Sequence, residues 1–267
     1  MNTNSPTAIL GELSTVIRGV ARACGVLLVV SAFFFIFGIR TVPLFGYSVP
    51  IPTPVPAGDS FAGLFFERMQ ADLIPESIRL VVTTPLEAFT AQVQIAFALA
   101  LIVLMPIFLL RSVLFFSDAL YPNEQRALVR TVTPSLLLFI LGATFAYIFI
   151  IPPTIVFLYG YASSLGAETL FSTGSFVGMV VGLMLAVGTM FMTPVAMALL
   201  SWLGVVPPVF WVEQWRYALL TLLIFSAIIT PDGSGVTMLL VSVPLSALYG
   251  VGYMASIHGV RKSLPAN

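Results

Sequence analysis

Long apolar stretches separated by short polar segments dominate the pattern of this chain. Each stretch is roughly 20 residues long, which is the length that a helix needs to cross about 30 Å of hydrocarbon. The segments between them contain the prolines, glycines and charged residues that typically end or connect helices. The pattern predicts membrane-spanning helices near residues 20–39, 89–115, 131–152, 174–200, 217–230 and 236–256.

The fifth and sixth predicted spans are short and lie close together. The segment 217–230 is marginal against the usual length of about 17–25 residues, although local thinning of the bilayer can accommodate a short helix in a bundle. The chain is expected to turn sharply after this segment, because Pro231 and Gly233 interrupt the helical pattern there.

The composition agrees with a location in lipid. Of the 267 residues, 59% are apolar and 8% are charged, and the mean hydropathy is +1.06. A soluble domain needs a polar surface that so few charges cannot supply, whereas a bilayer removes that need. We therefore expect an all-α, polytopic helical bundle that forms one domain over 1–267 and resides in the cell membrane as a multi-pass protein.

The basic residues predict the orientation of this bundle. If the spans alternate, three arginines fall on one side, all in the long loop at 40–85, and the other eight basic residues fall opposite. Cytoplasmic loops carry the excess of Lys and Arg, so both termini are expected in the cytoplasm. The eight are Arg18, Arg22, Arg111, Arg126, Arg130, Arg216, Arg261 and Lys262.

The long loop at 40–85 has two parts. Its prolines at 43, 50, 52, 54 and 56 favour an extended, polyproline-like stretch. Apolar residues then recur at helical spacing, which predicts an amphipathic helix along the outer interface or a cap on the bundle; a simple lid is the alternative. These apolar residues are Phe61, Leu64, Phe65, Met69, Leu73 and Ile74.

Motifs for catalysis and metal binding are missing from the sequence. It contains no Gly-rich phosphate loop ending in Lys-Ser/Thr, no zinc-binding histidine pair and no nucleophile set beside a base. Cys24 and His258 are the single residues of their kinds, and the formal net charge is zero. We therefore expect no enzyme, no metal, no cofactor and no nucleic-acid partner.

Two carboxylates are predicted at the cytoplasmic face. Glu12 precedes the first span, and Glu124 lies in the loop between the second and third spans. Each could accept one guanidinium group in bidentate geometry, which Arg provides and Lys does not. A helix-dipole charge at Glu12 and a solvated loop acid at Glu124 remain as alternatives.

Other candidate residues lie at the ends of spans or inside them. Glu87 follows Pro85 at the start of the second span, where helix capping also explains it, and Asp232 lies in the turn between the last spans, where turn formation does. Prolines inside or at the ends of spans are expected to kink the helices. They are Pro106, Pro134, Pro152, Pro194 and Pro244.

Several short segments, taken in their order and spacing, resemble the TatC family, the multispanning receptor subunit of the twin-arginine protein translocase. The resemblance covers nearly the whole chain. Its segments are Gly-Glu-Leu at 11–13, Pro-Leu-Glu-Ala-Phe at 85–89, Pro106, FFSDALYPNEQR at 115–126, LFILGATFAY at 138–147, Phe-Met-Thr-Pro at 191–194, Trp-Leu-Gly at 202–204, Arg-Tyr at 216–217 and Thr-Pro-Asp at 230–232.

The resemblance implies a fold and a function. The fold is a concave, glove-like bundle of six transmembrane helices with short last spans. The function is to bind twin-arginine signal peptides of folded precursor proteins at the cytoplasmic face, as the core of a translocase driven by the proton-motive force. The implied partners are TatA-type and TatB-type single-span subunits, further copies of this chain in a homo-oligomer, and membrane lipid.

The resemblance also implies roles for particular residues. Glu12 and Glu124 occupy the positions that face the paired arginines, and we expect Arg126, in the same segment as Glu124, to belong to this site. Structural or partner contacts are expected at Glu87, Pro106, Pro194 and Asp232.

The chain departs from the family pattern at two positions where an acid is usual. Met192 stands where the family carries a membrane-buried Glu, and Gly250 stands where another Glu is common. Loss of a buried acid removes a desolvation cost and also a polar contact to partner helices. These departures predict altered partner binding or a specialised paralogue. Ser14, Asp118 and Gln125 depart from the pattern as well.

Two alternative functions make different demands on the sequence. A small-solute transporter or channel needs ionisable groups near the bilayer midplane, whereas the acids of this chain gather at the ends of the spans. A membrane enzyme acting on lipid-linked substrates would have to use Asp118, Glu124 and Arg126.

Overall fold

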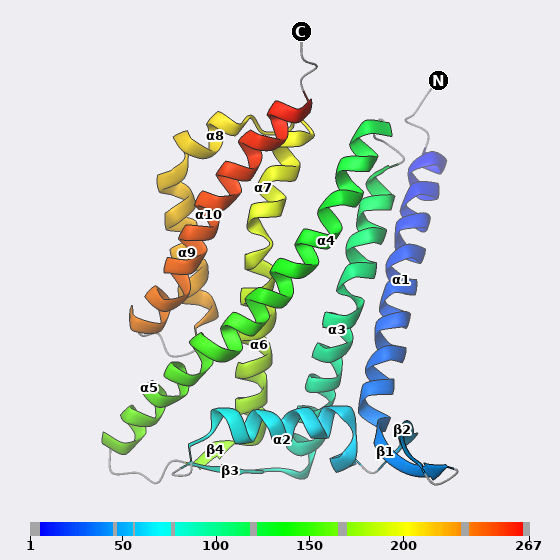
Figure 1. Ribbon diagram of the computed structural model, residues 1–267, viewed down its shortest axis with the longest axis vertical. Helices are drawn as coiled ribbons and strands as arrows, with labels where there is room; N and C mark the ends of the chain where they lie inside the picture. Colours follow the sequence, from blue (N-terminus) through cyan, green and yellow to red (C-terminus); the bar gives the residue numbers. More distant parts are fainter. Residues whose placement is uncertain are drawn as a thin grey trace. The chain divides into compact units, whose positions relative to one another are not determined.

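The computed structural model describes residues 6–44, 47–55, 57–75, 78–117, 122–164, 170–230 and 235–263. Within these ranges it describes no side chains over 6–16, 41–44, 47–51, 57, 106–107, 109–117, 122–130, 161–164, 170 and 258–263. Helices dominate it (Figure 1). In chain order the elements are α1 (Pro6–Ile36), β1 (Phe37–Leu44), β2 (Tyr47–Pro54), η1 (Ala57–Asp59), α2 (Phe61–Leu73), β3 (Arg79–Val81), α3 (Pro85–Ser117), α4 (Pro122–Phe145), η2 (Ala146–Ile150), α5 (Ile151–Ser164), β4 (Leu170–Ser172), α6 (Thr173–Phe191), α7 (Thr193–Trp202), α8 (Pro208–Glu213), α9 (Trp215–Ile229) and α10 (Gly235–Ser263).

Five helices are long and apolar enough to cross a membrane within the described part of the chain. They confirm five of the predicted spans, and most ends agree to within about four residues. Two ends differ more: Pro85–Met105 ends before the predicted 115, and Thr131–Gly160 runs past the predicted 152. The predicted fifth span corresponds to α9, which is apolar but has only 15 residues, so its crossing of the bilayer stays a prediction. The five are Ile17–Ile36, Pro85–Met105, Thr131–Gly160, Thr173–Trp202 and Gly235–Ile257.

The chain forms two compact units. The first comprises Met1–Arg68 and Gln92–Leu104, and the second comprises Met69–Ala91 and Met105–Asn267. In the first unit, Phe33 and Phe34 near the end of α1 pack their rings against Phe61 of α2, with ring centroids 6.0 and 5.7 Å apart. Most of the preceding apolar stretch of α1 is exposed, as expected of a helix whose surroundings are lipid.

The proline-rich part of the long loop is a β-hairpin, so the predicted polyproline-like stretch is wrong. Strands β1 and β2 pair antiparallel, with Phe37 opposite Pro54 and Leu44 opposite Tyr47. Val55 N–H donates to Ile36 C=O, which places the odd-numbered residues of β2 in the hydrogen-bonded positions and the prolines in the others. Alternate prolines therefore leave the ladder intact.

The hairpin is joined to η1 by a close approach of the backbone. A Cβ atom on Gly38 would collide with the backbone carbonyl of Asp59, so only glycine fits at this position. Arg40 on the same strand forms an exposed ion pair with Asp59, at 3.4 Å between Nη2 and Oδ2. An exposed pair of this kind contributes little by itself, so the glycine contact is the tighter constraint.

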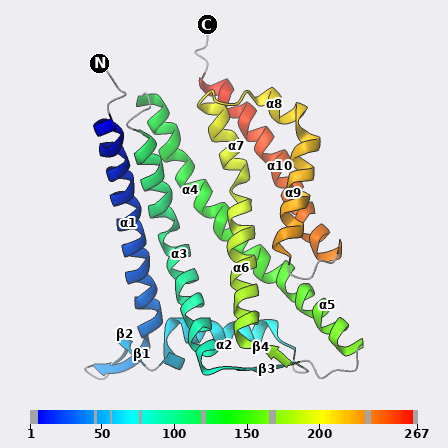
Figure 2. The same cartoon turned by 180° about the vertical axis from the view of Figure 1, so that it is seen from behind.

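In the second unit, α4 crosses α6 at two glycines. A Cβ on Gly142 would lie 2.6 Å from Cγ of Phe191 and 3.0 Å from Cα of Gly188, and a Cβ on Gly188 would lie 3.1 Å from the backbone oxygen of Phe139. Small residues at such a crossing let the helix backbones approach closely, which is how helices associate in membranes without a hydrophobic driving force. Figure 2 shows this crossing from the side of α6.

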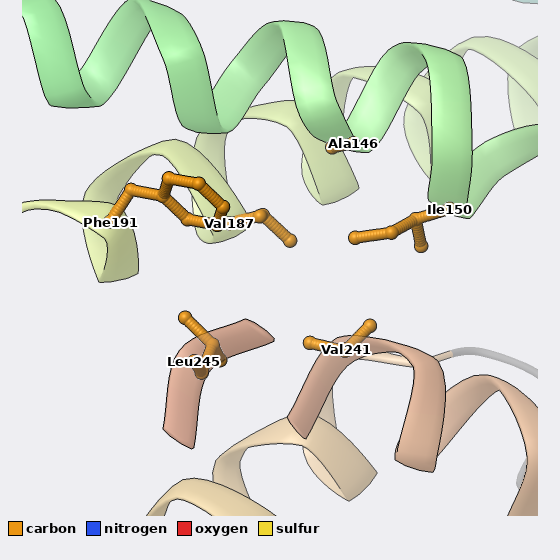
Figure 3. Close-up of a cluster of buried hydrophobic side chains, with 6 residues drawn as sticks. All are labelled: Ala146, Ile150, Val187, Phe191, Val241 and Leu245. Carbon is orange, nitrogen blue, oxygen red and sulfur yellow. The ribbon is translucent and has the colours of Figure 1, made fainter. Parts of the chain in front are cut away.

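The core of the second unit joins three helical segments. Its fully or nearly buried side chains come from η2, α6 and α10, and Figure 3 shows them pointing toward one another. These positions recur at helical spacing within long apolar runs, so the buried face is part of the same pattern that predicts the spans. They are Ala146, Ile150, Val187, Phe191, Val241 and Leu245.

Proline separates α6 from α7. Pro194 has no N–H to donate to the carbonyl of Met190, and α6 ends at Phe191 accordingly. The hydroxyl of Thr193 donates to that carbonyl instead, at 2.6 Å. The expected irregularity at Pro194 is thus observed as a break at Met192, with the freed carbonyl satisfied by the neighbouring side chain.

A second irregularity lies before Pro152 and Pro153. The five residues of η2 form a π-helix, in which Ile151 N–H donates five residues back to Ala146 C=O. Two consecutive residues without an N–H group prevent the regular α ladder from continuing, and a π segment is a common adjustment. The hydroxyl of Thr154 donates to Ile150 C=O at 2.7 Å as the α-helix resumes.

Replacing Gly252 on α10 by Ala is expected to destabilise the protein. The new Cβ would lie 2.7 Å from Sδ of Met197 and 2.9 Å from Cα of Pro194, so α7 and α10 would have to separate. Overpacking of this kind costs about 1–3 kcal/mol of unfolding free energy. Thermal unfolding in detergent micelles measures the change.

The matched control is Gly250→Ala on the same helix, where a Cβ meets no heavy atom within 4 Å. Ala is the better helix former by up to about 1 kcal/mol, so this variant should be neutral or more stable. Equal losses in both variants would contradict the close packing of α7 on α10.

Candidate functional site

Short strands bring two helix starts together in the second unit. Strands β3 and β4 pair parallel, with Arg79 opposite Leu170 and Val81 opposite Ser172. Helix α3 begins at Pro85 shortly after β3, and α6 begins at Thr173 directly after β4. Ser172 is the N-cap of α6, with extended backbone and a side-chain oxygen that accepts from Ser175 N–H.

The carboxylate of Glu87 lies between these two helix starts. Its Oε1 accepts a hydrogen bond from Gly174 N–H at 2.7 Å and another from the hydroxyl of Ser172. Its Oε2 accepts from Thr83 N–H at 2.8 Å and from the hydroxyl of the same threonine. A Cβ on Gly174 would lie 2.8 Å from Cγ of Glu87, so a glycine leaves the space that this carboxylate needs.

This arrangement is a structural connection rather than an open binding site. A carboxylate has about four acceptor positions, and four donors of the described residues fill them at Glu87. The N-terminus of a helix carries orphan N–H groups and partial positive charge, so an anion there is favourable. Glu87 therefore caps the start of α6 and also holds Thr83, just before α3, against the first turn of its own helix.

A second polar contact ties α2 to the π segment in the same unit. The hydroxyl of Tyr147 in η2 donates to Oδ2 of Asp72 near the end of α2, at 3.1 Å. On the part of α2 that belongs to this unit, Met69 and Leu73 are buried and Asp72 is exposed, which agrees with an amphipathic helix. The position of α2 at a membrane interface stays a prediction.

The two predicted guanidinium-binding acids lie in different helices. Glu12 lies in α1, and Glu124 and Arg126 lie in the first two turns of α4; their side chains are outside the described residues. The expectation of a loop at Glu124 is wrong, because α4 already begins at Pro122. Proline is favoured at the first position of a helix, and an acid in the first turn is favoured by the helix dipole.

The residues predicted for structural or partner contacts, and the two positions that lack the usual acid, lie on several different elements. Pro106 lies within α3, and Pro194 lies at the start of α7 against Gly252. Asp232 is outside the described residues. Met192, where the family pattern has a buried acid, is the half-buried residue at the break between α6 and α7, and Gly250 lies on α10.

Sequence reasoning did not identify the partners of Glu87. Ser172 and Gly174 lie 85 and 87 residues away along the chain, so no local pattern connects them to this acid. A partial signal existed, since Ser172 directly before an apolar helical run is a typical N-cap. Nothing in the sequence showed which acid would approach that cap.

Comparisons with known proteins agree on one family. The model of the Sec-independent protein translocase protein (TatC) matches residues 8–244. A TatC protein of Cenarchaeum symbiosum is 37% identical over 237 residues, which covers 89% of this chain and 89% of the relative. TatC of Escherichia coli K12 is 28% identical over 205 residues, covering 76% and 79%.

A solved structure shares the fold as well. The crystal structure of the twin-arginine translocase receptor TatC superimposes with a TM-score of 0.71 at 26% sequence identity. The superposition covers 93% of this chain and 99% of the solved chain. The fold is therefore similar over almost the full length.

Replacing Glu87 by Gln is expected to loosen the start of α6. The amide keeps one acceptor oxygen and points an NH₂ group at the remaining donors, so part of the hydrogen bonding is lost. Hydrogen exchange of the amides of Gly174 and Ser175 should become faster, and the thermal unfolding temperature should fall. Glu67→Gln, an exposed acid on α2, is the control and should change neither quantity. Unchanged exchange at Gly174 in the Glu87 variant would refute the capping role.

Proposed function

This chain belongs to the TatC family of Sec-independent protein translocase proteins, and we propose that it acts as the receptor for twin-arginine signal peptides of folded precursor proteins. It is a multi-pass membrane protein of the twin-arginine translocase. The family match over residues 8–244, joined to a fold that superimposes on a twin-arginine translocase receptor, is the observation that carries this function.

We propose that Glu12 and Glu124 bind the paired arginines at the cytoplasmic face. A carboxylate and a guanidinium form two parallel, charge-assisted hydrogen bonds, and such pairs are stronger where lipid and protein exclude water. A lysine supplies a single point charge and cannot form this fork. Arg126, two residues beyond Glu124, would add guanidinium donors for carbonyl groups of the bound peptide.

The proposed membrane arrangement follows the expectations from the sequence. Residues 1–267 form one TatC-like membrane domain with six crossings, and the short helix α9 is the fifth of them. Both termini lie in the cytoplasm, because that orientation places eight of the eleven basic residues on the cytoplasmic side.

The chain works as part of a Tat complex with other subunits. We propose that these are TatA-type and TatB-type single-span proteins and further copies of this chain. Because Met192 and Gly250 carry no charge, contacts at these positions would depend on close packing rather than on a buried acid. We further propose that this chain catalyses no reaction and that the proton-motive force drives transport.

A small-solute transporter is disfavoured by the distribution of ionisable residues. The segments Thr131–Gly160, Thr173–Trp202 and Gly235–Ile257 contain none of Asp, Glu, Lys, Arg or His. The acid of Pro85–Met105 is Glu87, whose oxygens are already occupied by four hydrogen-bond donors. A path for ions or polar solutes would need available polar groups at depth.

Replacing both Glu12 and Glu124 by Gln is expected to weaken binding of a twin-arginine signal peptide by about ten- to a hundredfold. Each Gln keeps one acceptor oxygen, so the estimated loss for the pair is that of a single charged hydrogen bond, about 1.5–3 kcal/mol. Fluorescence anisotropy of a labelled peptide, titrated with the purified protein in nanodiscs, measures the dissociation constant.

Two controls separate recognition from a general loss of charge. Glu213→Gln removes an exposed acid elsewhere and should leave affinity unchanged. A peptide with two lysines in place of the arginines should bind the wild-type protein more weakly than the twin-arginine peptide does. The double variant should discriminate less between these two peptides. Full affinity of the double variant for the twin-arginine peptide would exclude these residues as the site.

A further inference from the structure

The connection between α7 and α9 is unusually apolar for a segment outside the spans. Here the α7–α9 connection means residues 203–214, and Glu213 is its single charged residue. Loops that face water are normally polar, because their side chains and backbone are hydrated. The composition of this connection therefore indicates surroundings other than bulk water.

The backbone of the connection begins with a well-formed helix end. Gly204 has a φ of 72°, the left-handed conformation that favours glycine. Its N–H donates to Ser201 C=O, and Val205 N–H donates to Leu200 C=O, which are the two hydrogen bonds of a Schellman motif. The chain then turns into Pro207 and Pro208, and the first helical position of α8 is the proline at 208.

Two hydrogen bonds fix α8 against its neighbours. The indole N–H of Trp211 donates to the hydroxyl of Ser201 on α7 at 2.9 Å, and Ser201 is buried. The hydroxyl of Tyr249 on α10 donates to the backbone carbonyl of Trp211 at 2.7 Å. The rings of Trp211 and Tyr249 also meet edge to face, with centroids 6.5 Å apart. Trp211 therefore defines the inner side of α8.

The other sides of α8 are exposed and apolar apart from Glu213. Val209 is 63% exposed, and Phe210 and Val212 on either side of Trp211 are 44% and 45% exposed. Glu213 lies one turn after Val209 on the same side and is exposed too. The exposed apolar surface continues into the connection before α8 and along α9. It includes Val205, Trp215, Tyr217, Leu220, Ile224, Phe225 and Ile228.

We propose that α8 lies in the headgroup region of the bilayer and binds the lipid surface with Val209, Phe210 and Val212. The helix before it ends the apolar span Thr173–Trp202, and the apolar helix α9 follows it. The exposed surface of α8 thus lies between the end of a membrane span and the exposed apolar surface of α9. Its inner side is held to the bundle, so the apolar side chains on its other faces are free to enter the interface.

The residues that flank α8 are those enriched at membrane interfaces. Trp215 begins α9 with Tyr217 close behind, and both side chains are exposed. Trp and Tyr prefer the headgroup level, where one end of the ring is apolar and the other is hydrated. The guanidinium of Arg216 lies 5.7 Å from the ring centre of Trp215, and in the proposed position it would be close to lipid phosphates. Glu213 offsets this charge, so insertion would depend mainly on the apolar and aromatic side chains and little on anionic lipid.

A spin label at Val209 tests this proposal in the full chain. Cys24→Ser removes the single native cysteine, and Val209→Cys or Val212→Cys then carries the label, with one protein molecule in each phosphatidylcholine nanodisc. Collision rates with oxygen, which concentrates in lipid, and with a water-soluble nickel chelate give the depth of the label. The hydrocarbon reference is Val243→Cys, 64% exposed on α10 inside the span Gly235–Ile257, and the water reference is a free label in buffer.

Labels at 209 and 212 are expected to collide more often with oxygen than with the nickel chelate, and the label at 243 should do so too. Their depth should be about 5–10 Å below the phosphate groups, which is shallower than the label at 243. Access to the nickel chelate equal to that of the free label, at both positions, would overturn the proposal. So would a label shielded from both reagents, because the occupant of the surface would then be protein. The measurement does not depend on signal-peptide binding.

Discussion

Every backbone N–H and C=O group that lies in hydrocarbon must find its hydrogen bond within the protein, because no water is available there. Each proline inside a long helix of this chain lacks an N–H group, so one backbone carbonyl loses its usual donor. At Pro194 the hydroxyl of Thr193 supplies the missing donor to Met190 C=O, and before Pro152 the helix shifts to a π ladder. The irregular points of the bundle are therefore places where the backbone repairs a lost hydrogen bond.

In the second unit the helix contacts are mainly apolar, and the acid Glu87 has its hydrogen bonds satisfied within the protein. The core where η2, α6 and α10 meet is apolar, and the helices cross where glycines allow their backbones to approach. The carboxylate of Glu87 lies at two helix N-termini, where it accepts from Gly174 N–H of α6 and from Thr83 N–H just before α3. The partial positive charge of the helix ends also stabilises its negative charge. In this way a single acid near a span contributes to architecture without leaving an unpaired charge in lipid.

The spans could be predicted well because a run of roughly 20 apolar residues is a strong and local signal. The predicted span 174–200 is observed as Thr173–Trp202, and 236–256 as Gly235–Ile257. The hairpin could not be predicted, since it depends on residues 37–44 pairing with 47–54 in a register that spares the proline nitrogens. For the candidate site, the capping tendency of Glu87 was visible beside Pro85, whereas its bonds to Ser172 and Gly174 required the pairing of β3 with β4. The start of α4 at Pro122 was missed because the polar residues after it lack apolar periodicity.

The order of prolines in β2 has a consequence for a protein that handles other polypeptides. Residues 50, 52 and 54 direct their backbone away from β1, and as prolines they offer no N–H on that edge. An extended segment of a passing chain, or of a second copy, would leave its own carbonyls unbonded if it tried to add to β2 as a further strand. The free edge of β2 is thereby closed to β-sheet extension, so a cargo chain close to this hairpin would not be captured along it.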